Sequence, residues 1–339
     1  MRILHCSYDS PDNPYVAGGG AKQTAELQVR LRARGHTYDW LHISRPECLH
    51  GYVRSRLRYS SRVSRDLWAH ARRYDVIVYE FSPFSPLWVP DEIRGKTVLA
   101  MWHRVPFAQM WRKVGPLAPL AWWAQRRTEH GFRRRVCLAP REGWTAIPPG
   151  VDDALFELEP EDHGFALFLG RLDIEQKGLD RLVRMWGEMG DAAPDLWIRG
   201  RGDSDAIFRL ATGHNNIFVR GEVSEDVKRE SLRTCSFVVM PSRYEGWGIA
   251  AVEAQAAGKV VIGWDIPGLR DALFRPTAMD SILLPYPSTE LYFQTMVVNY
   301  TDNVKWRQDQ GLLAREWARQ FTWDRCADRW EAYLRETCA

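Results

Sequence analysis

Short apolar runs alternate with longer amphipathic segments along most of the chain. In the N-terminal half these runs are RILHCSY from Arg2, TYDWLHI from Thr37, YDVIVYEF from Tyr74 and TVLAMWH from Thr97. Each has the length of a buried strand, and the segments between them are long enough to hold helices. Strands that alternate with helices predict an α/β fold with a doubly wound parallel sheet.

The stretch IPPGVDDALFELEP from Ile147 interrupts this alternation with three prolines, a glycine and several acidic residues, and it predicts a linker. A second series of apolar runs follows: FALFLGRL from Phe165, DLWIRG from Asp195, NIFVRG from Asn216, SFVVMPS from Ser236, KVVIGWD from Lys259 and SILLPY from Ser281. We therefore expect two α/β domains of similar size, residues 1–155 and 156–320. The amphipathic segment FTWDRCADRWEAYLRET, residues 321–337, predicts a closing helix.

The composition fits a folded protein, because 45% of the 339 residues are hydrophobic. The six cysteines show none of the spacings of a zinc site, so we interpret them as reduced thiols. No run of eighteen apolar residues occurs, and the N-terminal sequence does not have the apolar core of a signal peptide. These features predict a cytoplasmic protein.

Positive charge is concentrated in the first half of the chain. Residues 1–155 contain 24 basic and 14 acidic residues, a net charge of +10, and the remaining residues carry −7. Residues 51–73 hold seven arginines against one acidic residue, and residues 104–135 hold eight basic residues against one acidic residue, with tryptophans between them. These segments suit an anionic membrane surface at which the protein binds peripherally, or an anionic acceptor. Alternatively, they are solvated faces whose tryptophans pack inward. No nucleic-acid-binding motif occurs, and we expect no nucleic-acid partner.

Two strand-to-helix loops carry residues suited to an anionic ligand. Gly18, Gly19 and Gly20 precede the first predicted helix, where they let a phosphate approach the backbone or simply form a flexible turn. Arg171 and Lys177 lie between the strand from Phe165 and the next helix. There they are either a clamp for a diphosphate or hydrated surface cations.

Two carboxylates, Glu245 and Glu253, flank the beginning of another predicted helix. Eight helical residues span about 12 Å, whereas the paired carboxylates of glycosidases lie roughly 5 to 9.5 Å apart. This spacing favours two hydrogen-bonding roles at opposite ends of one long ligand, with the turn at Gly246, Trp247 and Gly248 presenting N–H groups to it. The alternative is structural: Glu245 stabilises the helix N-terminus and Glu253 is an internal polar residue.

Three further residues need an interpretation. His103 ends the strand TVLAMWH at the carboxyl edge where active-site groups collect, and it is either catalytic or structural. Asp203 and Asp205 form an Asp-x-Asp pattern, but they stand where a helix should begin. Capping explains them better than a metal site does, and we expect no metal.

In five places the chain resembles the retaining GT-B glycosyltransferases of family 4. The similar segments are GGGAKQTAELQVRLRARGH, FLGRLDIEQKG, EGWGIAAVE, EAQAAGKVVIGWDIPGLRD and FTWDRCADRWEAYLRE. They occur in the family's order and extend over almost the full chain. The resemblance implies two Rossmann-like domains that face a central cleft, with residues 321–339 crossing back as a helix to the first domain.

The resemblance also implies roles for individual residues. Arg171 and Lys177 would hold the donor's diphosphate, and Glu253 its ribose hydroxyls. Glu245 and the turn from Gly246 to Gly248 would hold the donor sugar. The opening glycines would approach the phosphate and the acceptor, and His103 would orient the reacting sugar. The family normally needs no bound metal or other cofactor.

These residues predict a retaining transferase of the hexosyltransferase type. It would move a sugar from a nucleotide-diphosphate donor to the hydroxyl of an acceptor glycan, lipid-linked sugar or small metabolite. A non-catalytic relative that binds nucleotide-sugars and a sugar-nucleotide epimerase of the same fold are the alternatives.

Overall fold

The computed structural model describes residues 1–10, 19–44, 52–81, 89, 91–101, 107–274, 283–285 and 290–338. The chain divides into two compact units, Met1–Pro149 with Trp323–Ala339, and Gly150–Thr322. The predicted boundaries, after residues 155 and 320, fall close to these points. Of the cysteines in the described ranges, none forms a disulfide. No helix within those ranges is both long and apolar enough to cross a bilayer.

The first unit is built on a parallel sheet. Within the described residues this sheet has six strands in the order β2-β1-β3-β4-β5-β6. Their bounds are β1 Arg2–Ser7, β2 Thr37–His42, β3 Val76–Glu80, β4 Thr97–Met101, β5 Arg134–Cys137 and β6 Thr145–Ala146. In the register, Ile3 lies opposite Tyr38 of β2 and Val76 of β3. The central strands are buried on both faces, as continuous apolar runs predict.

Strands β5 and β6 were not predicted from the sequence. β5 begins with Arg134 and Arg135, which belong to the basic segment 104–135, so it does not have the apolar pattern of the other strands. Both side chains are half-buried, and the guanidinium of Arg135 lies 5.4 Å from the ring centroid of Trp144. Two cations of the basic segment 104–135 therefore lie in the sheet rather than on a solvated face.

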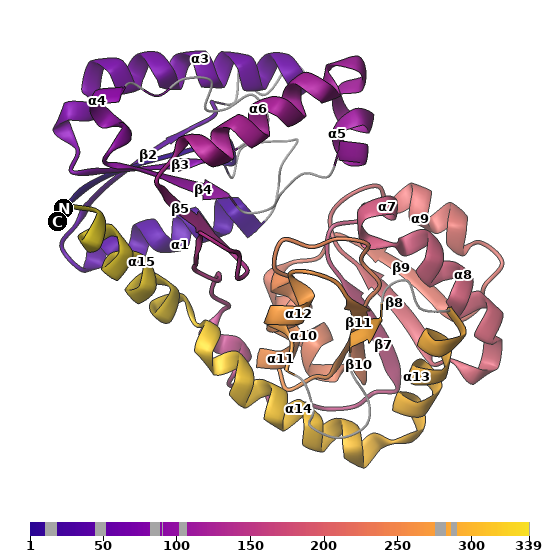
Figure 1. Ribbon diagram of the computed structural model, residues 1–339. Helices are drawn as coiled ribbons and strands as arrows, with labels where there is room; N and C mark the ends of the chain where they lie inside the picture. The colour runs from indigo at the N-terminus through magenta and orange to yellow at the C-terminus, as the bar shows by residue number, and fades with distance from the viewer. Residues whose placement is uncertain are drawn as a thin grey trace. The chain divides into compact units, whose positions relative to one another are not determined.

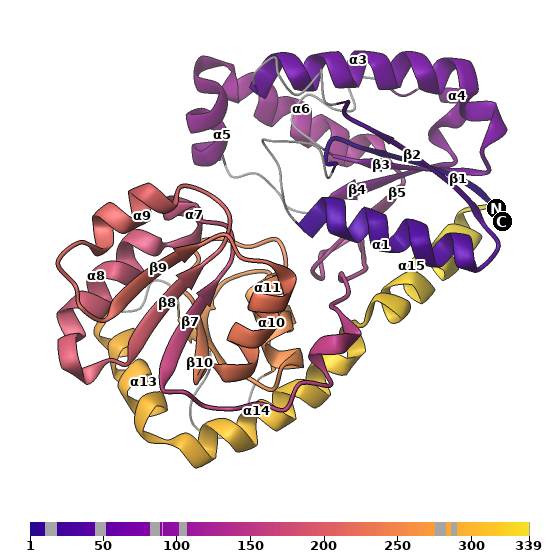
Figure 2. The same ribbon diagram turned by 180° about the vertical axis from the view of Figure 1, so that it is seen from behind.

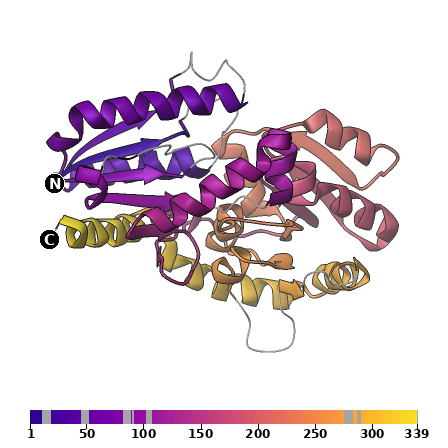
Figure 3. The ribbon, with the colours of Figure 1, turned by 45° about the horizontal axis from the view of Figure 1, so that its top comes forward.

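Helices cover both faces of this sheet (Figure 1). The helices of the unit are α1 Gly19–Ala33, α3 Tyr52–His70, α4 Asp91–Arg94, α5 Phe107–Val114, α6 Ala118–Gly131 and α15 Trp323–Cys338. Alternate residues of β1 point to opposite cores: Ile3 packs with residues of α1 and α15, whereas Leu4 packs with residues of α3. Figure 3 shows α3 and α15 on opposite sides of the strands.

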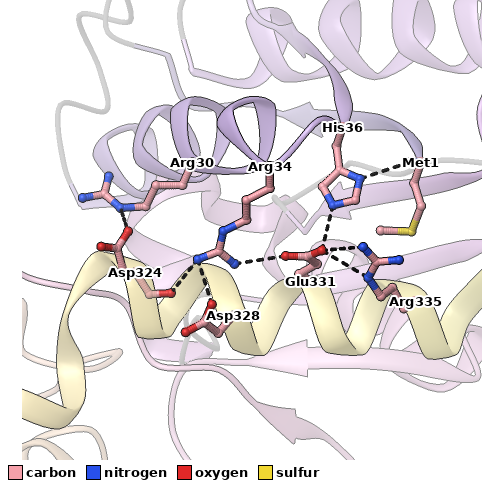
Figure 4. Close-up of polar contacts among 8 residues, drawn as sticks. All are labelled: Met1, Arg30, Arg34, His36, Asp324, Asp328, Glu331 and Arg335. Atoms are coloured by element: carbon pink, nitrogen blue, oxygen red, sulfur yellow. Dashed lines mark hydrogen bonds and ion pairs between the residues drawn. The ribbon is translucent and has the colours of Figure 1, made fainter.

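The C-terminal helix α15 packs along α1, which confirms the prediction that it returns to the first domain. Trp330 of α15 is fully buried in the core between the two helices and the sheet. Charged side chains reinforce the contact (Figure 4): Arg30 binds Asp324 at 2.8 Å, and Arg34 binds Glu331 at 3.1 Å. The amphipathic pattern of residues 321–337 thus reflects an apolar face buried against α1 and the sheet.

The second unit repeats this architecture. Its described strands form a six-stranded parallel sheet in the order β12-β11-β10-β7-β8-β9. The bounds are β7 Phe165–Leu169, β8 Asp195–Arg199, β9 Ile217–Gly221, β10 Phe237–Met240, β11 Val261–Asp265 and β12 Leu283–Pro285. All six correspond to predicted apolar runs. The two α/β units confirm the predicted fold class.

The helices of the second unit also lie on both faces of their sheet, with α8 and α9 on one side and α10 and α11 on the other (Figure 2). Their bounds are α7 Ile174–Lys177, α8 Leu179–Met189, α9 Ser204–Ala211, α10 Glu225–Thr234, α11 Ile249–Ala256, α12 Leu269–Ala272, α13 Glu290–Asp302 and α14 Val304–Ala318. Helix α13 packs on α8, and α14 packs on α11. The sheet is therefore a doubly wound one, with its loops available for a site.

Candidate functional site

The sheet of the second unit changes its winding direction between β7 and β10. The chain proceeds from β7 to β8 on one side and from β10 to β11 on the other, although β7 and β10 are neighbours. In such sheets the loops after the two strands diverge and leave a ligand site at their carboxyl ends. Arg171 and Lys177 follow β7, and Glu245 follows β10. The predicted residues of this unit therefore belong to the loops and helices that follow these two strands.

Lys177 and Glu245, which are distant in sequence, form an ion pair between Nζ and Oε1. Their side chains are only 11% and 7% exposed. The hydroxyl of Ser242 donates to the same carboxylate oxygen at 2.7 Å. A buried carboxylate and a buried ammonium need such partners, because each loses its hydration on folding. Since an ammonium has three donors, Lys177 can bind an anion while it keeps Glu245.

Arg171 is the exposed cation of this group. Its Nη2 donates to Oε1 of Gln176, a buried residue of α7. One guanidinium edge is thereby fixed, and the exposed remainder can interact with a ligand in solution. Arg171 precedes α7 and Lys177 is its last residue, so the segment between β7 and α8 carries both positive charges.

A further arginine connects the two loops. Arg243, after β10, donates from Nη1 and Nη2 to the carboxylate of Asp180 on α8 at 2.8 and 2.7 Å. Burial would raise the pKa of Asp180, but the hydrogen bonds and charge of Arg243 outweigh it, and the pKa is lowered. The Arg243 guanidinium also donates to the Glu175 carbonyl at 2.8 Å. This bidentate pair fixes α7 and α8 against the loop that carries Glu245.

Gly178, between α7 and α8, allows the same close approach. Its backbone is left-handed with φ +66°, and a Cβ there would lie 2.2 Å from the carbonyl oxygen of Pro241. Any side chain would force α7 away from the loop after β10. The glycine next to Lys177 therefore sets the distance at which Lys177 meets Glu245.

Glu253 lies inside α11, and a second lysine holds it. Oε1 of Glu253 accepts a hydrogen bond from Nζ of Lys228 on α10 at 3.0 Å, and Glu225 binds the same ammonium at 2.7 Å. Burial would lower the pKa of Lys228, but the two carboxylates outweigh it and raise the pKa. Lys228 therefore stays charged and fixes the Glu253 carboxylate.

The predicted turn at Gly246, Trp247 and Gly248 precedes α11, which begins at Ile249. The ring of Trp247 is 3% exposed and packs against Phe321 with centroids 5.3 Å apart. The Trp247 side chain thus belongs to the core, and its contribution to a site would come from the main chain. The first N–H groups of α11 have no intrahelical acceptor and can bind an anion or a hydroxyl. Glu253 lies about 6 Å further along the helix axis from Ile249.

The residues predicted for the first unit are described only in part. Gly19 and Gly20 begin α1, so the glycine run does lead into a helix N-terminus. Gly18 and His103 lie outside the described residues.

The capping interpretation of the Asp-x-Asp pattern is confirmed. Oδ1 of Asp203 accepts a hydrogen bond from the N–H of Ala206 at 2.9 Å at the start of α9, and Asp205 follows in the first turn. Within the described ranges, no group of three or more His, Cys, Asp or Glu side chains is arranged to hold a metal ion.

Sequence reasoning missed three residues of this site: Ser242, Arg243 and Lys228. The first two stand three and two residues before Glu245 and could have been found by extending the motif toward the strand. Lys228 lies in the first turns of α10, three residues after Glu225, which is an ordinary pattern for a helical surface pair. Only the packing of α10 against α11 shows that it binds Glu253.

Two Rossmann-like units with a C-terminal helix that returns to the first of them define the two-domain GT-B fold. Residues 164–297, which include all the site residues of the second unit, match the family model described as Glycosyl transferases group 1. The D-inositol 3-phosphate glycosyltransferase of Jonesia denitrificans is 31% identical over 211 residues, which is 53% of this chain and 48% of that protein. This chain thus matches about half the length of that relative.

Solved structures show the same fold over nearly the whole chain. Sucrose-phosphate synthase from Thermosynechococcus elongatus superposes with a TM-score of 0.78, 17% identity and coverage of 99% of this chain and 98% of that one. HepE from Anabaena, in complex with UDP and glucose, has a TM-score of 0.65 and 14% identity, and the match covers 99% of this chain and 100% of that one. At these identities the likeness establishes the GT-B fold and not the substrate.

Proposed function

We propose that this protein is a retaining glycosyltransferase of GT-B family 4 and of the hexosyltransferase type. It transfers a sugar from a nucleotide-diphosphate donor to the hydroxyl of an acceptor. The observation that carries the proposal is the buried pair of Lys177 and Glu245, with Arg171 beside it, at the switch point of the second sheet. The match of residues 164–297 to a glycosyltransferase family supports the same conclusion.

In this proposal the donor lies across the carboxyl ends of β7 and β10. Arg171 and Lys177 bind the diphosphate, and Glu253, held by Lys228, accepts hydrogen bonds from the ribose hydroxyls. Glu245 and the main chain from Gly246 to Gly248 bind the donor sugar. In this arrangement the carboxylates accept hydrogen bonds from hydroxyl groups, and the remaining donors of Arg171 and Lys177 bind phosphate oxygens.

The proposed reaction is attack by the acceptor hydroxyl on the anomeric carbon from the face of the leaving diphosphate. The bond between that carbon and the diphosphate oxygen breaks, the new glycosidic bond forms, and the departing phosphate takes the hydroxyl proton. Arg171 and Lys177 stabilise the charge that develops on the diphosphate. His103, which lies outside the described residues, would orient the sugar ring, and no bound metal is required.

The acceptor in this proposal is an anionic, lipid-linked or saccharide hydroxyl compound bound mainly by the first unit. The net charge of +10 on residues 1–155 supports an anionic acceptor. The name of the Jonesia relative includes an inositol phosphate, which is an acceptor of this kind.

The test begins with a thermal-shift screen of the purified chain against UDP-, GDP- and ADP-linked sugars. A donor that binds the folded state raises the melting temperature. The stabilising donor is then incubated with inositol phosphate, lipid-linked sugar or oligosaccharide acceptors, and release of the nucleoside diphosphate is measured. Release that depends on both substrates, with an α-linked product from an α-linked donor by NMR, supports the proposal. Binding without turnover in any pairing, or an epimerised donor, would contradict it.

A further inference from the structure

The outer surface of α5 and α6 in the first unit carries large apolar side chains that the core does not use. The two helices pack together through Met110, Ala118 and Ala121, which are buried. Six other residues, Phe107, Trp111, Leu117, Leu120, Trp122 and Trp123, are between 37% and 56% exposed. We call these six residues the aromatic surface. The alternative that the tryptophans of residues 104–135 pack inward is therefore wrong for Trp111, Trp122 and Trp123.

Three side chains of the aromatic surface, from both helices, form a contiguous cluster of rings. The ring of Phe107 on α5 lies 6.3 Å from that of Trp111 and 6.3 Å from that of Trp122 on α6, edge-on in the second case. Scattered single apolar residues are ordinary on protein surfaces, but a contiguous cluster marks a surface that binds something.

Arginines lie directly on this cluster. The guanidinium of Arg126 is 4.7 Å from the ring centroid of Trp122, and that of Arg127 is 5.3 Å from that of Trp123. The acidic residue in the sequence of α5 and α6 is Glu129, which is buried and accepts from Arg141 at 2.9 Å. The exposed part of the surface is therefore apolar and positive, without an opposing acidic side chain from these two helices.

The basic helix α3 adjoins α5 and α6, because Val53 near its first turn packs against their buried residues Met110, Ala118 and Ala121. Its arginines divide into two groups. Arg54, Arg58 and Arg65 are exposed along one face. Arg56 lies over the Tyr8 ring at 4.1 Å, and Arg62 donates to the His42 carbonyl at 2.7 Å. The first group presents positive charge to solvent, and Arg65 of this group also lies 3.8 Å from Asp66.

We propose that the aromatic surface binds the chain peripherally to a bilayer that contains anionic lipids. Trp and Leu side chains of amphipathic helices enter the boundary between headgroups and acyl chains, and arginines above them reach the lipid phosphates. Charge complementarity selects this partner, because Arg126 and Arg127 attract phosphate groups as the rings leave water. The inference does not depend on the proposed transferase activity, since lipid binding is measured without donor or acceptor.

The experiment is vesicle co-sedimentation of the full chain with phosphatidylcholine alone and with phosphatidylcholine mixed with phosphatidylglycerol. We expect binding to the mixed vesicles that weakens as salt is added, and little binding to phosphatidylcholine. The variant Trp111→Ser with Trp123→Ser should bind at least tenfold more weakly. Arg126→Glu with Arg127→Glu should bind more weakly and with a smaller salt dependence, because each arginine is worth roughly fivefold in binding at an anionic surface.

A matched control lies on α9 of the second unit, where Phe208 is 64% exposed and Arg209 is exposed beside it. Phe208→Ser with Arg209→Glu removes comparable groups outside the aromatic surface and should leave vesicle binding unchanged. Unchanged thermal melting of every variant shows that each is folded. Equal binding to the two vesicle types, wild-type binding by the tryptophan variant, or self-association through α5 and α6 in light scattering would each overturn the proposal.

Discussion

The two units share an architecture but place their positive charges differently. In the second unit, the side chains of Lys177 and Lys228 are only 11% and 13% exposed, and each meets a carboxylate of the segment that contains α11. In the first unit, Arg126 and Arg127 lie on the outside of a helix against tryptophan rings. A buried, compensated cation suits a small anionic ligand that enters a defined site, whereas an exposed cation on an apolar surface suits an extended anionic partner. The difference shows why a net charge of +3 for the whole chain says little about its partners.

The largest effect is expected when Lys177, the first buried cation of the second unit, is removed. We expect Lys177→Ala to lower kcat/KM for transfer by roughly 10² to 10³, the magnitude typical for loss of one group that stabilises developing charge. The measurement is nucleoside diphosphate release at varied donor concentration.

The control for Lys177 is Lys305→Ala on α14. Lys305 is 84% exposed and pairs with Asp309 one turn away, so this variant removes a paired lysine without touching the site. It should keep wild-type kinetics. Because Lys177→Ala leaves Glu245 buried without its lysine, circular dichroism and thermal melting must show a folded variant. Near-normal turnover by a folded Lys177→Ala would remove Lys177 from the mechanism.

A smaller effect is expected at the second buried cation. Lys228→Met keeps the volume of the side chain but releases the Glu253 carboxylate, which should then bind the donor's ribose less well. We expect the KM for the donor to rise about tenfold, equivalent to about 1.4 kcal/mol, with kcat changed much less.

The comparison for Lys228 is Glu225→Gln. Glu225 is the other, more exposed partner of the same ammonium, and its loss leaves the pair of Lys228 and Glu253 in place. Steady-state kinetics of the two variants should therefore differ. If both raise the KM equally, the ammonium matters only for the stability of α10, and the assignment of Glu253 to the ribose loses its support.

The sequence predicted ten of the strands because each is an apolar run between turn signals. It missed β5 and β6. The first two residues of β5 are arginines that become half-buried in the folded unit, where Arg135 lies beside Trp144. At the site, the motif around Glu245 and Glu253 was visible because its residues are close in sequence. The partners of those two carboxylates could not be predicted from the sequence. That Lys177 meets Glu245 and Lys228 meets Glu253 depends on which strands are neighbours, and on which helices pack over them. A single sequence does not contain that information.

The smallest predicted effect concerns Glu331, an acidic residue that helps to hold α15 on the first unit. Glu331 on α15 accepts hydrogen bonds from Arg34 at 3.1 Å and Arg335 at 2.7 Å, and it contacts His36 at 3.0 Å (Figure 4). The hydrogen bonds of Arg335 and His36 lower its pKa from 4.5 to about 2. Because the pKa in the folded state lies below the unfolded value, the ionised carboxylate stabilises the fold above pH 4.5. That contribution disappears as the pH falls toward about 2.

Glu331→Gln should therefore lower the free energy of unfolding at neutral pH by about 1 kcal/mol, a modest value because solvent screens part of the interaction. The difference between wild type and variant should shrink steadily between pH 4.5 and about pH 2, as urea denaturation at several pH values would measure. Glu316→Gln on α14, where the carboxylate is 68% exposed and pairs with Arg319, should change stability little at any pH. If the cost of Glu331→Gln did not depend on pH, its charge would not contribute to holding α15 on α1. Apolar contacts such as those of Trp330 would then account for the attachment of this helix to the first unit.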